Sequence, residues 1–216
     1  MSHITLVRHG QANTQARDEA SYDRLSDLGH RQAAWLGDHL RASANHHPRV
    51  YSGTLQRHVE TARGMAVGDA VQDERLNELE YFTLAKLMEE QHGLPMPVER
   101  EGFVSHLPQV FSAWHDGKLE GAPETFAQFE TRITDVLSEI SQGPGAGLVV
   151  TSGGLIAIVM RQMMGLDMQA TARIALAIMN TSMHRMYMIG DRMSPVLFNA
   201  VPHLETPDRH FAQTHF

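Results

Sequence analysis

The segment from Ile4 to Gln11 places a guanidinium and an imidazole side by side. Residues 4–7 are an apolar run of the kind that forms a buried strand, and Arg8 and His9 follow at its end. Gly10 comes next, and glycine tolerates backbone angles that bring the chain close to a ligand. A cation beside a neutral imidazole can hold a phosphoryl group and attack it. The alternative is that Arg8 and His9 are two solvated side chains in a loop and have no catalytic role.

A second segment, residues 51–62, supplies another cation. Its sequence predicts a strand that ends at Ser52 and a helix whose apolar face holds Leu55, Val59 and Ala62. Arg57 then falls in the first turn of that helix. The free N–H groups and partial positive charge of a helix N-terminus attract anions, and an arginine there reinforces the site. The alternative for Arg57 is a solvated side chain on a polar helix face.

A third segment, residues 147–156, repeats the arrangement of a strand followed by a helix. Its continuous apolar run ends in the small residues Ser152, Gly153 and Gly154, after which apolar residues recur at helical spacing. In open parallel sheets, ligands bind outside the carboxyl ends of the strands. We therefore expect His9, Arg57 and Ser152 to lie at one edge of a sheet.

The elements that position these residues alternate between strands and helices along the chain. Strands are predicted near 3–8, 49–52, 147–152, 184–189 and 195–199, and helices near 27–43, 54–67, 126–141, 154–164 and 169–178. This order predicts an α/β fold with three layers, α/β/α, and a mostly parallel central sheet. Residues 1–216 are expected to form a single domain. Two further apolar helical patterns predict a helical cap insertion at about 79–124.

Composition limits the classes of function. A chain of 216 residues with 42% hydrophobic residues can bury a large core. Its net charge of −7 argues against nucleic acid and anionic membranes as partners, and without cysteine it forms no disulfide. The 14 histidines show no recognised ligand spacing, so we predict neither a metal nor another cofactor. With no signal peptide and no long apolar run, we expect a cytoplasmic protein.

The ordered set of segments resembles the histidine phosphatase superfamily, the phosphoglycerate-mutase-like proteins. The resemblance is carried by Leu6 to Gly10, Ser52 to Ala62 and residues 149–154. It extends to Tyr22 to Ser26, Leu28-Gly29, Gln32-Ala33, Leu76 to Glu78 and Asn199 to Leu204, which is nearly the whole chain.

The resemblance implies a role for each matching residue. His9 would be the nucleophile that becomes a phosphohistidine, and Arg8 and Arg57 would bind the phosphoryl oxygens. Ser152 and Gly153 would complete the phosphate site. Glu78 would donate a proton to the leaving group, although the neighbouring Glu80 is an alternative for this role.

The chain departs from the family pattern at Ser152, where the family usually has a second catalytic histidine. Serine offers a neutral hydrogen bond and no positive charge, which is expected to slow phosphoryl transfer by roughly ten- to a hundredfold. On this basis alone, Ser152→His is predicted to raise turnover. The aromatic and glycine residues that usually follow the acid are also replaced, here by Tyr81-Phe82-Thr83.

The preferred function is a metal-independent phosphatase that hydrolyses a phosphomonoester through a phosphohistidine on His9. Its expected partner is a phosphorylated small molecule or a phosphoprotein, and a homodimer is left open. One alternative is a weak or inactive module of the same fold that binds a phosphorylated ligand, and another is a phosphomutase. The retained His9, Arg8, Arg57 and Glu78 favour the enzyme, whereas Ser152 favours the module.

Overall fold

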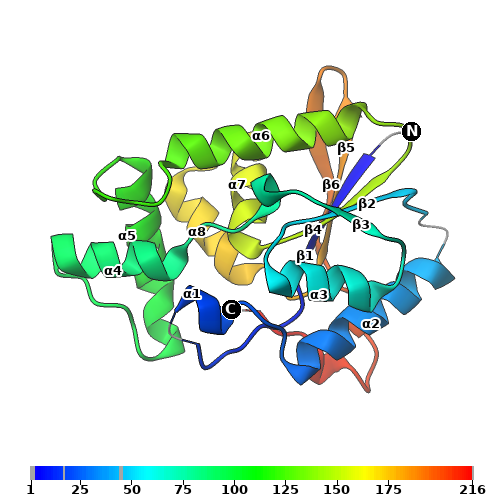
Figure 1. The fold of residues 1–216 in the computed structure, drawn as a ribbon, viewed down its shortest axis with the longest axis horizontal. Coiled ribbons are helices and arrows are strands. Elements are labelled where there is room, and N and C mark those ends of the chain that lie inside the picture. The colour runs from blue at the N-terminus through cyan, green and yellow to red at the C-terminus, as the bar shows by residue number, and fades with distance from the viewer. Residues whose placement is uncertain (1–2, 17, 44–45, 216) are drawn as a thin grey trace.

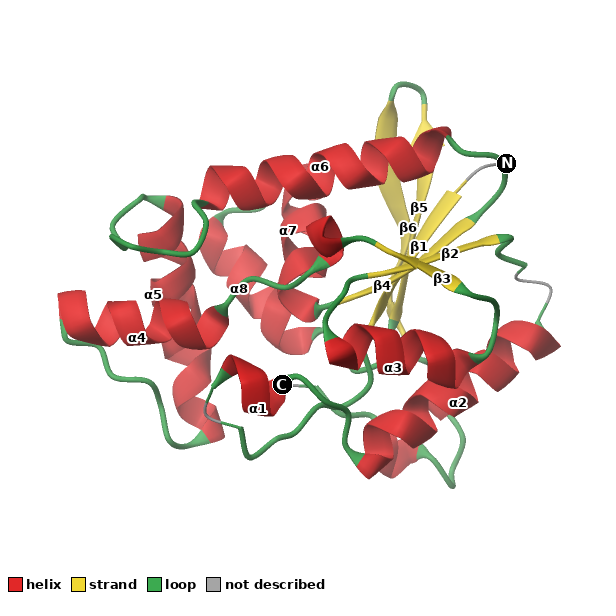
Figure 2. Cartoon of the chain, viewed as in Figure 1, coloured by secondary structure: helices red, strands yellow, loops and turns green. Residues whose placement is uncertain are grey.

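A computed structural model describes residues 3–16, 18–43 and 46–215 of the protein. Helices pack against both faces of a central sheet, as Figure 1 and Figure 2 show. This three-layer arrangement confirms the predicted α/β fold with a mostly parallel sheet. None of the described helices is long and apolar enough to cross a membrane.

The sheet of the described residues has six strands in the order β3-β2-β4-β1-β5-β6. Their bounds are β1 (His3–Arg8), β2 (Arg49–Ser52), β3 (Ala70–Gln72), β4 (Gly147–Thr151), β5 (Met183–Ile189) and β6 (Arg192–Ala200). The first four strands of the chain run parallel, and β5 is antiparallel to both β1 and β6. The edge strand β3 was not predicted, because three residues, two of them exposed, leave no pattern in the sequence.

Some of the described helices cover the two faces of the sheet. The bounds of the described α-helices are α1 (Glu19–Tyr22), α2 (Asp27–Ala42), α3 (Gln56–Met65), α4 (Tyr81–His92), α5 (Phe103–His115), α6 (Phe126–Gln142), α7 (Gly153–Met164) and α8 (Met168–Ala177). Helices α2 and α3 cover one face, where alternate residues of the strands, such as Val7 and Val150, form a core. Helices α6 and α7 cover the other face and pack with Leu6 and Val149, and α8 packs against α7 and α5.

Helices α4 and α5 come from the segment predicted as a cap. They lie beside α8, away from the sheet (Figure 1), and their buried side chains belong to the same core as those of α6 and α7. Leu84 of α4 and Phe111 of α5 are among the buried members of that core. The two helices therefore share a core with α6 and α7.

The register of the parallel strands brings the predicted site residues together. Arg8 of β1 pairs with Thr151 of β4, and Ser52 of β2 pairs with Val150. Beyond the paired residues, the backbone N–H of His9 donates to the carbonyl of Thr151 at 2.9 Å. Three segments that are distant in the sequence thus leave the sheet at one edge.

Candidate active site

A cavity of about 430 Å³ opens at the carboxyl edge of the sheet. Arg8, His9, Arg57, Glu78 and Gly153, all predicted as site residues, line it. The structure therefore gathers residues that are separated by up to 145 positions, as Arg8 and Gly153 are. The sixth predicted residue, Ser152, is fully buried and does not appear in the cavity lining.

His9 lies at the end of β1 with its imidazole buried. The ring nitrogen Nδ1 donates a hydrogen bond to the carbonyl of Gly10 at 2.7 Å, which fixes the proton on Nδ1 and leaves the lone pair on Nε2. Burial lowers the pKa of His9 well below its ordinary value, and the charges of Arg57, Arg8 and His58 lower it further. A neutral imidazole with a free Nε2 is the form that can act as a nucleophile.

Two buried guanidinium groups flank this imidazole. Arg8 donates from one terminal nitrogen to the carbonyl of Ile178, and no described residue forms an ion pair with it. The Nε atoms of Arg8 and Arg57 are both buried and lack a hydrogen-bond partner among the described residues. Buried cations and buried N–H donors are costly unless they are matched. A bound anion could match the charge of Arg8, whereas Arg57 already has the Asp23 carboxylate as a partner.

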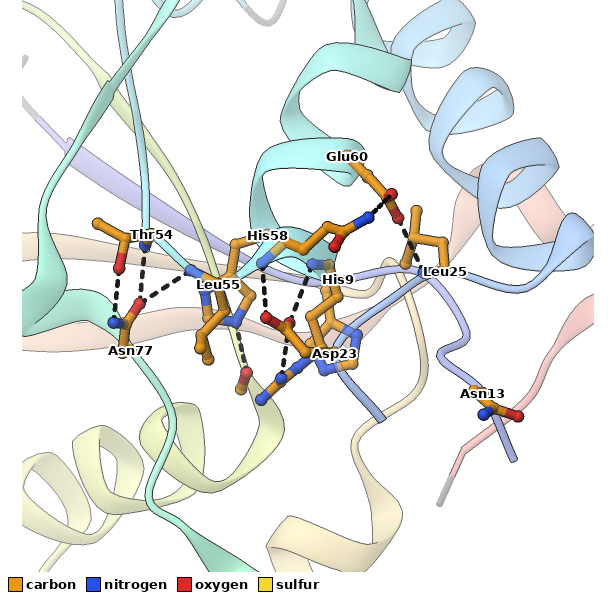
Figure 3. A network of polar contacts seen from close by, with 12 residues as sticks. His9, Asn13, Asp23, Leu25, Thr54, Leu55, His58, Glu60 and Asn77 are labelled. Carbon is orange, nitrogen blue, oxygen red and sulfur yellow. Dashed lines mark hydrogen bonds and ion pairs between the residues drawn. The ribbon is translucent and has the colours of Figure 1, made fainter. Parts of the chain in front are cut away.

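Asp23 holds Arg57 in place and also closes the start of α3. Its carboxylate accepts from a terminal nitrogen of Arg57 at 2.9 Å and from the backbone N–H of Gln56 at 2.9 Å. The residue before the helix is Leu55, which has no polar side chain to cap the helix, so Asp23 supplies that cap from another loop (Figure 3). The Arg57 guanidinium also lies 5.0 Å from the centroid of the Tyr22 ring.

Glu78 reaches the cavity from the loop before α4. Its carboxylate accepts from the backbone N–H groups of Gly154, at 2.9 Å, and Leu155, at 3.1 Å, and so lies at the N-terminus of α7. A Cβ on residue 154 would come within 2.6 Å of the Glu78 carboxylate, so this glycine makes room for the acid. Glu80, the alternative acid, is exposed and does not line the cavity.

A second carboxyl group, that of Glu19 on α1, faces the same cavity. Burial raises the pKa of Glu19 to about 7, against the opposing effects of the Phe82 backbone N–H, which donates at 2.8 Å, and of the Arg57 charge. An acid with this pKa carries a proton in part of the molecules at neutral pH. Glu19 was not predicted from the sequence, because a four-residue helix between loops leaves no periodic signal.

His58, which lies beside His9, was also not predicted as a site residue from the sequence. Its ring is fully buried, its centroid lies 5.7 Å from that of the His9 ring, and its Nε2 lies 2.6 Å from the hydroxyl oxygen of Ser152. Figure 3 shows His58 beside His9 and Asp23. The position of His58, directly after Arg57 in the first turn of a helix, was the one signal available in the sequence.

The rest of the cavity wall has a polar part and an apolar part. The polar part holds the side chains of Gln11, Asn13, Thr14, Asn180, Gln213, Thr214 and His215. Helices α4 and α5 and the segments next to them contribute Leu79, Tyr81, Phe82, Val98, Phe103, Leu107 and Phe111. No lysine lines the cavity among the described residues. Among all the residues that the structure describes, no group of three or more histidine, aspartate or glutamate residues is arranged to hold a metal ion.

Comparison with family models gives one match, which covers residues 4–201. The matched model is described as the histidine phosphatase superfamily, branch 1. A search of curated proteins finds no match.

Solved structures with a similar fold include phosphatases and a mutase. A phosphoserine phosphatase mutant from Entamoeba histolytica, in complex with phosphoserine, is 14% identical with a TM-score of 0.69, over 94% of this chain and 100% of that one. A phosphoglycerate mutase from Bacillus anthracis is 21% identical with a TM-score of 0.66, over 94% of both chains. A mycobacterial glucosyl-3-phosphoglycerate phosphatase complexed with VO3 is 21% identical with a TM-score of 0.62, over 92% of this chain and 98% of that one.

Proposed function

The chain belongs to the histidine phosphatase superfamily, and from that premise we propose that it hydrolyses a phosphomonoester through a phosphohistidine on His9, without a metal ion. The observation that supports this most directly is the pair of buried guanidinium groups around a neutral imidazole. Arg8 and Arg57 each keep a buried Nε without a described partner, and His9 directs its free Nε2 away from the Gly10 carbonyl. Both arginines line the cavity together with His9, so a tetrahedral anion bound between them would bring its phosphorus to the nucleophile.

The proposed reaction has two steps. In the first, Nε2 of His9 attacks phosphorus in line with the ester oxygen, the P–O bond breaks, and the carboxyl group of Glu78 gives its proton to the departing alkoxide. In the second, the Glu78 carboxylate takes a proton from water, which attacks the phosphohistidine and breaks the P–N bond. Arg8 and Arg57 stabilise the charge on the equatorial oxygens in both steps. The products are an alcohol and inorganic phosphate.

The part of the cavity wall next to α4 and α5 favours a leaving group with an apolar body. Phe82, Phe103 and Phe111 offer aromatic surface, whereas Arg8 and Arg57 are engaged at the phosphoryl site. No lysine among the described lining residues is available to bind a second phosphate or a carboxylate of the substrate. We therefore propose phosphate esters of aromatic or aliphatic alcohols as the substrate class.

Hydrolysis of p-nitrophenyl phosphate in excess EDTA tests the proposed function. We expect turnover that the chelator leaves unchanged, because no step uses a metal ion. Rapid quenching with radiolabelled substrate should trap one phosphoryl group per chain, stable in alkali and labile in acid, as a phosphohistidine is. Loss of turnover on chelation, or a label that survives acid, would contradict the proposal.

A phosphate-binding module without turnover is the second candidate. Ser152 favours it, because a hydroxyl brings no positive charge to the phosphoryl group. In that case calorimetry would detect binding of inorganic phosphate or vanadate, while the EDTA experiment would show neither product nor label. A mutase would instead form the label and pass it to an added alcohol or sugar faster than to water.

Substitution of Glu78 by glutamine should produce a loss that depends on the leaving group. For phenyl phosphate, whose phenolate needs a proton, we expect kcat/KM to fall by about 100-fold, and for p-nitrophenyl phosphate by less than about tenfold. The ratio kcat/KM is the correct measure, because it depends only on the steps up to and including formation of the phosphoenzyme, in which the leaving group departs. Glu19→Gln keeps the shape of a protonated carboxyl and serves as the matched control, with less than about threefold loss for both esters.

Two results would argue against Glu78 as the proton donor. One is an equal loss for both esters in the Glu78 variant, which would indicate a role in binding. The other is a leaving-group dependence that appears in the Glu19 variant instead, which would move the donor to α1.

A further inference from the structure

Glu19 is a charged residue of the cavity wall that the proposed reaction does not use. The described lining residues with a charged side chain are Arg8, Arg57, Glu78 and Glu19. In the proposed reaction the two arginines hold the phosphoryl group, and Glu78 supplies a proton to the leaving group. The carboxyl of Glu19 faces the same space and has no part in either step.

The hydrogen bonding of Glu19 satisfies only part of its carboxyl group. One oxygen, Oε1, accepts from the backbone N–H of Phe82 at 2.8 Å, and the other forms no hydrogen bond with a described residue. No described cation lies within ion-pair distance of the carboxyl, although the Arg57 charge acts on it from further away. Burial raises the pKa of Glu19 to about 7, because the charged form loses water and gains no counter-ion. A cation beside this carboxyl would offset that cost.

Aromatic rings line the cavity next to this carboxyl. The ring centroid of Phe82 lies 5.9 Å from that of Tyr22 and 6.0 Å from that of Tyr81. Phe103 continues the series, with its centroid 6.1 Å from that of Tyr81, and all four residues line the cavity. The faces of aromatic rings attract cations, and alkylated ammonium groups are bound in proteins by such sets of rings.

Tyr22 connects this part of the wall to the phosphoryl site. Its ring centroid lies 6.2 Å from that of His9 and 5.0 Å from the guanidinium carbon of Arg57. In the series of rings, only Tyr22 lies between the imidazole of His9 and the ring of Phe82. A substrate with its phosphorus at His9 can therefore reach Phe82 and Glu19 with a short alcohol.

We propose that Glu19, Tyr22 and Phe82 form a subsite for a cationic leaving group, and that the substrates are phosphate esters of amino alcohols with an alkylated ammonium group. The inference rests on the proposed function and narrows its substrate class. In such an ester the ammonium lies between the Glu19 carboxylate and the phosphoryl group, whereas an uncharged alcohol leaves two anions facing each other. The rings favour an alkylated ammonium over a primary one, whose three N–H donors they cannot satisfy.

Phosphocholine and its uncharged carbon analogue, 3,3-dimethylbutyl phosphate, test the subsite. The two esters have the same shape and differ in a positive nitrogen replaced by carbon. Calorimetry on His9→Ala measures their binding without turnover, at pH 8, where both phosphates are dianions and the Glu19 carboxyl is largely ionised. We expect phosphocholine to bind at least about tenfold more tightly than the carbon analogue. Adding Glu19→Gln should reduce this preference to less than about threefold.

Steady-state kinetics give the same comparison in the active protein. Because the two alcohols differ as leaving groups, the measure is the change that a substitution causes in the ratio of the two kcat/KM values. Glu19→Gln should lower the ratio of phosphocholine to carbon analogue by about tenfold. Phe82→Leu keeps an apolar side chain without a ring face and should lower it by about threefold.

Glu80 provides the matched control for the charge of Glu19. Glu80→Gln removes a nearby carboxylate that is exposed and does not line the cavity. It should leave the ratio of the two kcat/KM values within about twofold of the parent. An equal change in the Glu80 and Glu19 variants would show that net charge, and not a subsite, sets the preference.

The outcomes separate this inference from the proposed function. If the parent protein hydrolyses p-nitrophenyl phosphate but the two probes bind equally, the subsite is wrong while the proposed function stands. The same holds if Glu19→Gln lowers both kcat/KM values by one factor, which would leave Glu19 a structural role at the start of α4. If the parent protein shows neither hydrolysis nor phosphoenzyme, the proposed function fails and the substrate class with it. Should Glu19→Gln not fold, Phe82→Leu and the two probes on His9→Ala decide.

Discussion

Substitution of His9 by alanine is expected to lower kcat/KM for p-nitrophenyl phosphate by at least about 10⁴-fold and to abolish the phosphoenzyme label. The reason is chemical, since the variant lacks the nitrogen on which the proposed intermediate forms. Steady-state assays and the rapid-quench label together measure the effect. The arginines remain, so vanadate or phosphate binding should persist within a few fold, as calorimetry can show.

Two further observations make this test decisive. Added imidazole should restore part of the activity of the alanine variant, because the space vacated by the ring opens to the cavity. A variant that keeps more than about 1% of the parent activity and still forms a covalent label would show that another side chain is the nucleophile, and His9 would lose its proposed role.

The second large effect is expected at Arg57. Arg57→Gln should lower kcat/KM by about 10²- to 10³-fold, because the charge that develops on the phosphoryl oxygens loses a guanidinium fixed within the buried site. The substitution also leaves the Asp23 carboxylate without its ion-pair partner, next to the incoming anion. Steady-state kinetics and vanadate inhibition measure the loss, which should appear in both.

Matched substitutions on the same helix give the control for Arg57. Arg63 lies on α3 with an exposed side chain, so Arg63→Gln should change kcat/KM by less than about twofold. Arg57→Lys keeps the charge and loses the two-pronged donor geometry, and an intermediate activity is expected. An Arg57→Gln variant with normal turnover would mean that the phosphoryl group binds elsewhere in the cavity.

Much of the fold could be predicted, because its longest and most buried elements have a clear pattern of apolar and polar residues in the sequence. Strand β1 has its predicted bounds, and helix α6 begins as predicted and ends one residue beyond its predicted end. Strands β5 and β6 are longer than predicted. Their additional residues, such as Arg192 and Met193, show no clear alternation of apolar and polar side chains in the sequence. The single-domain boundary and the cap at 79–124 stay predictions.

The site was predictable where a general rule of sheet geometry applied. Parallel strands end at one edge, and this brought Arg8, His9, Arg57 and Gly153 to one cavity. The partners of Ser152 and Arg57 were not predictable, because His58 and Asp23 reach them from other elements through packing that no local pattern specifies. The assignments of His9 and Glu78 as nucleophile and acid stay predictions until they are measured.

The ion pair between Asp23 and Arg57 has a consequence for the end of the proposed reaction. Arg57 already has an internal counter-ion, so an arriving ester would share Arg57 with the Asp23 carboxylate. The same competition would act on inorganic phosphate after hydrolysis and would weaken its binding. A pocket whose arginines had no such partner would bind its product more tightly and would be inhibited by it.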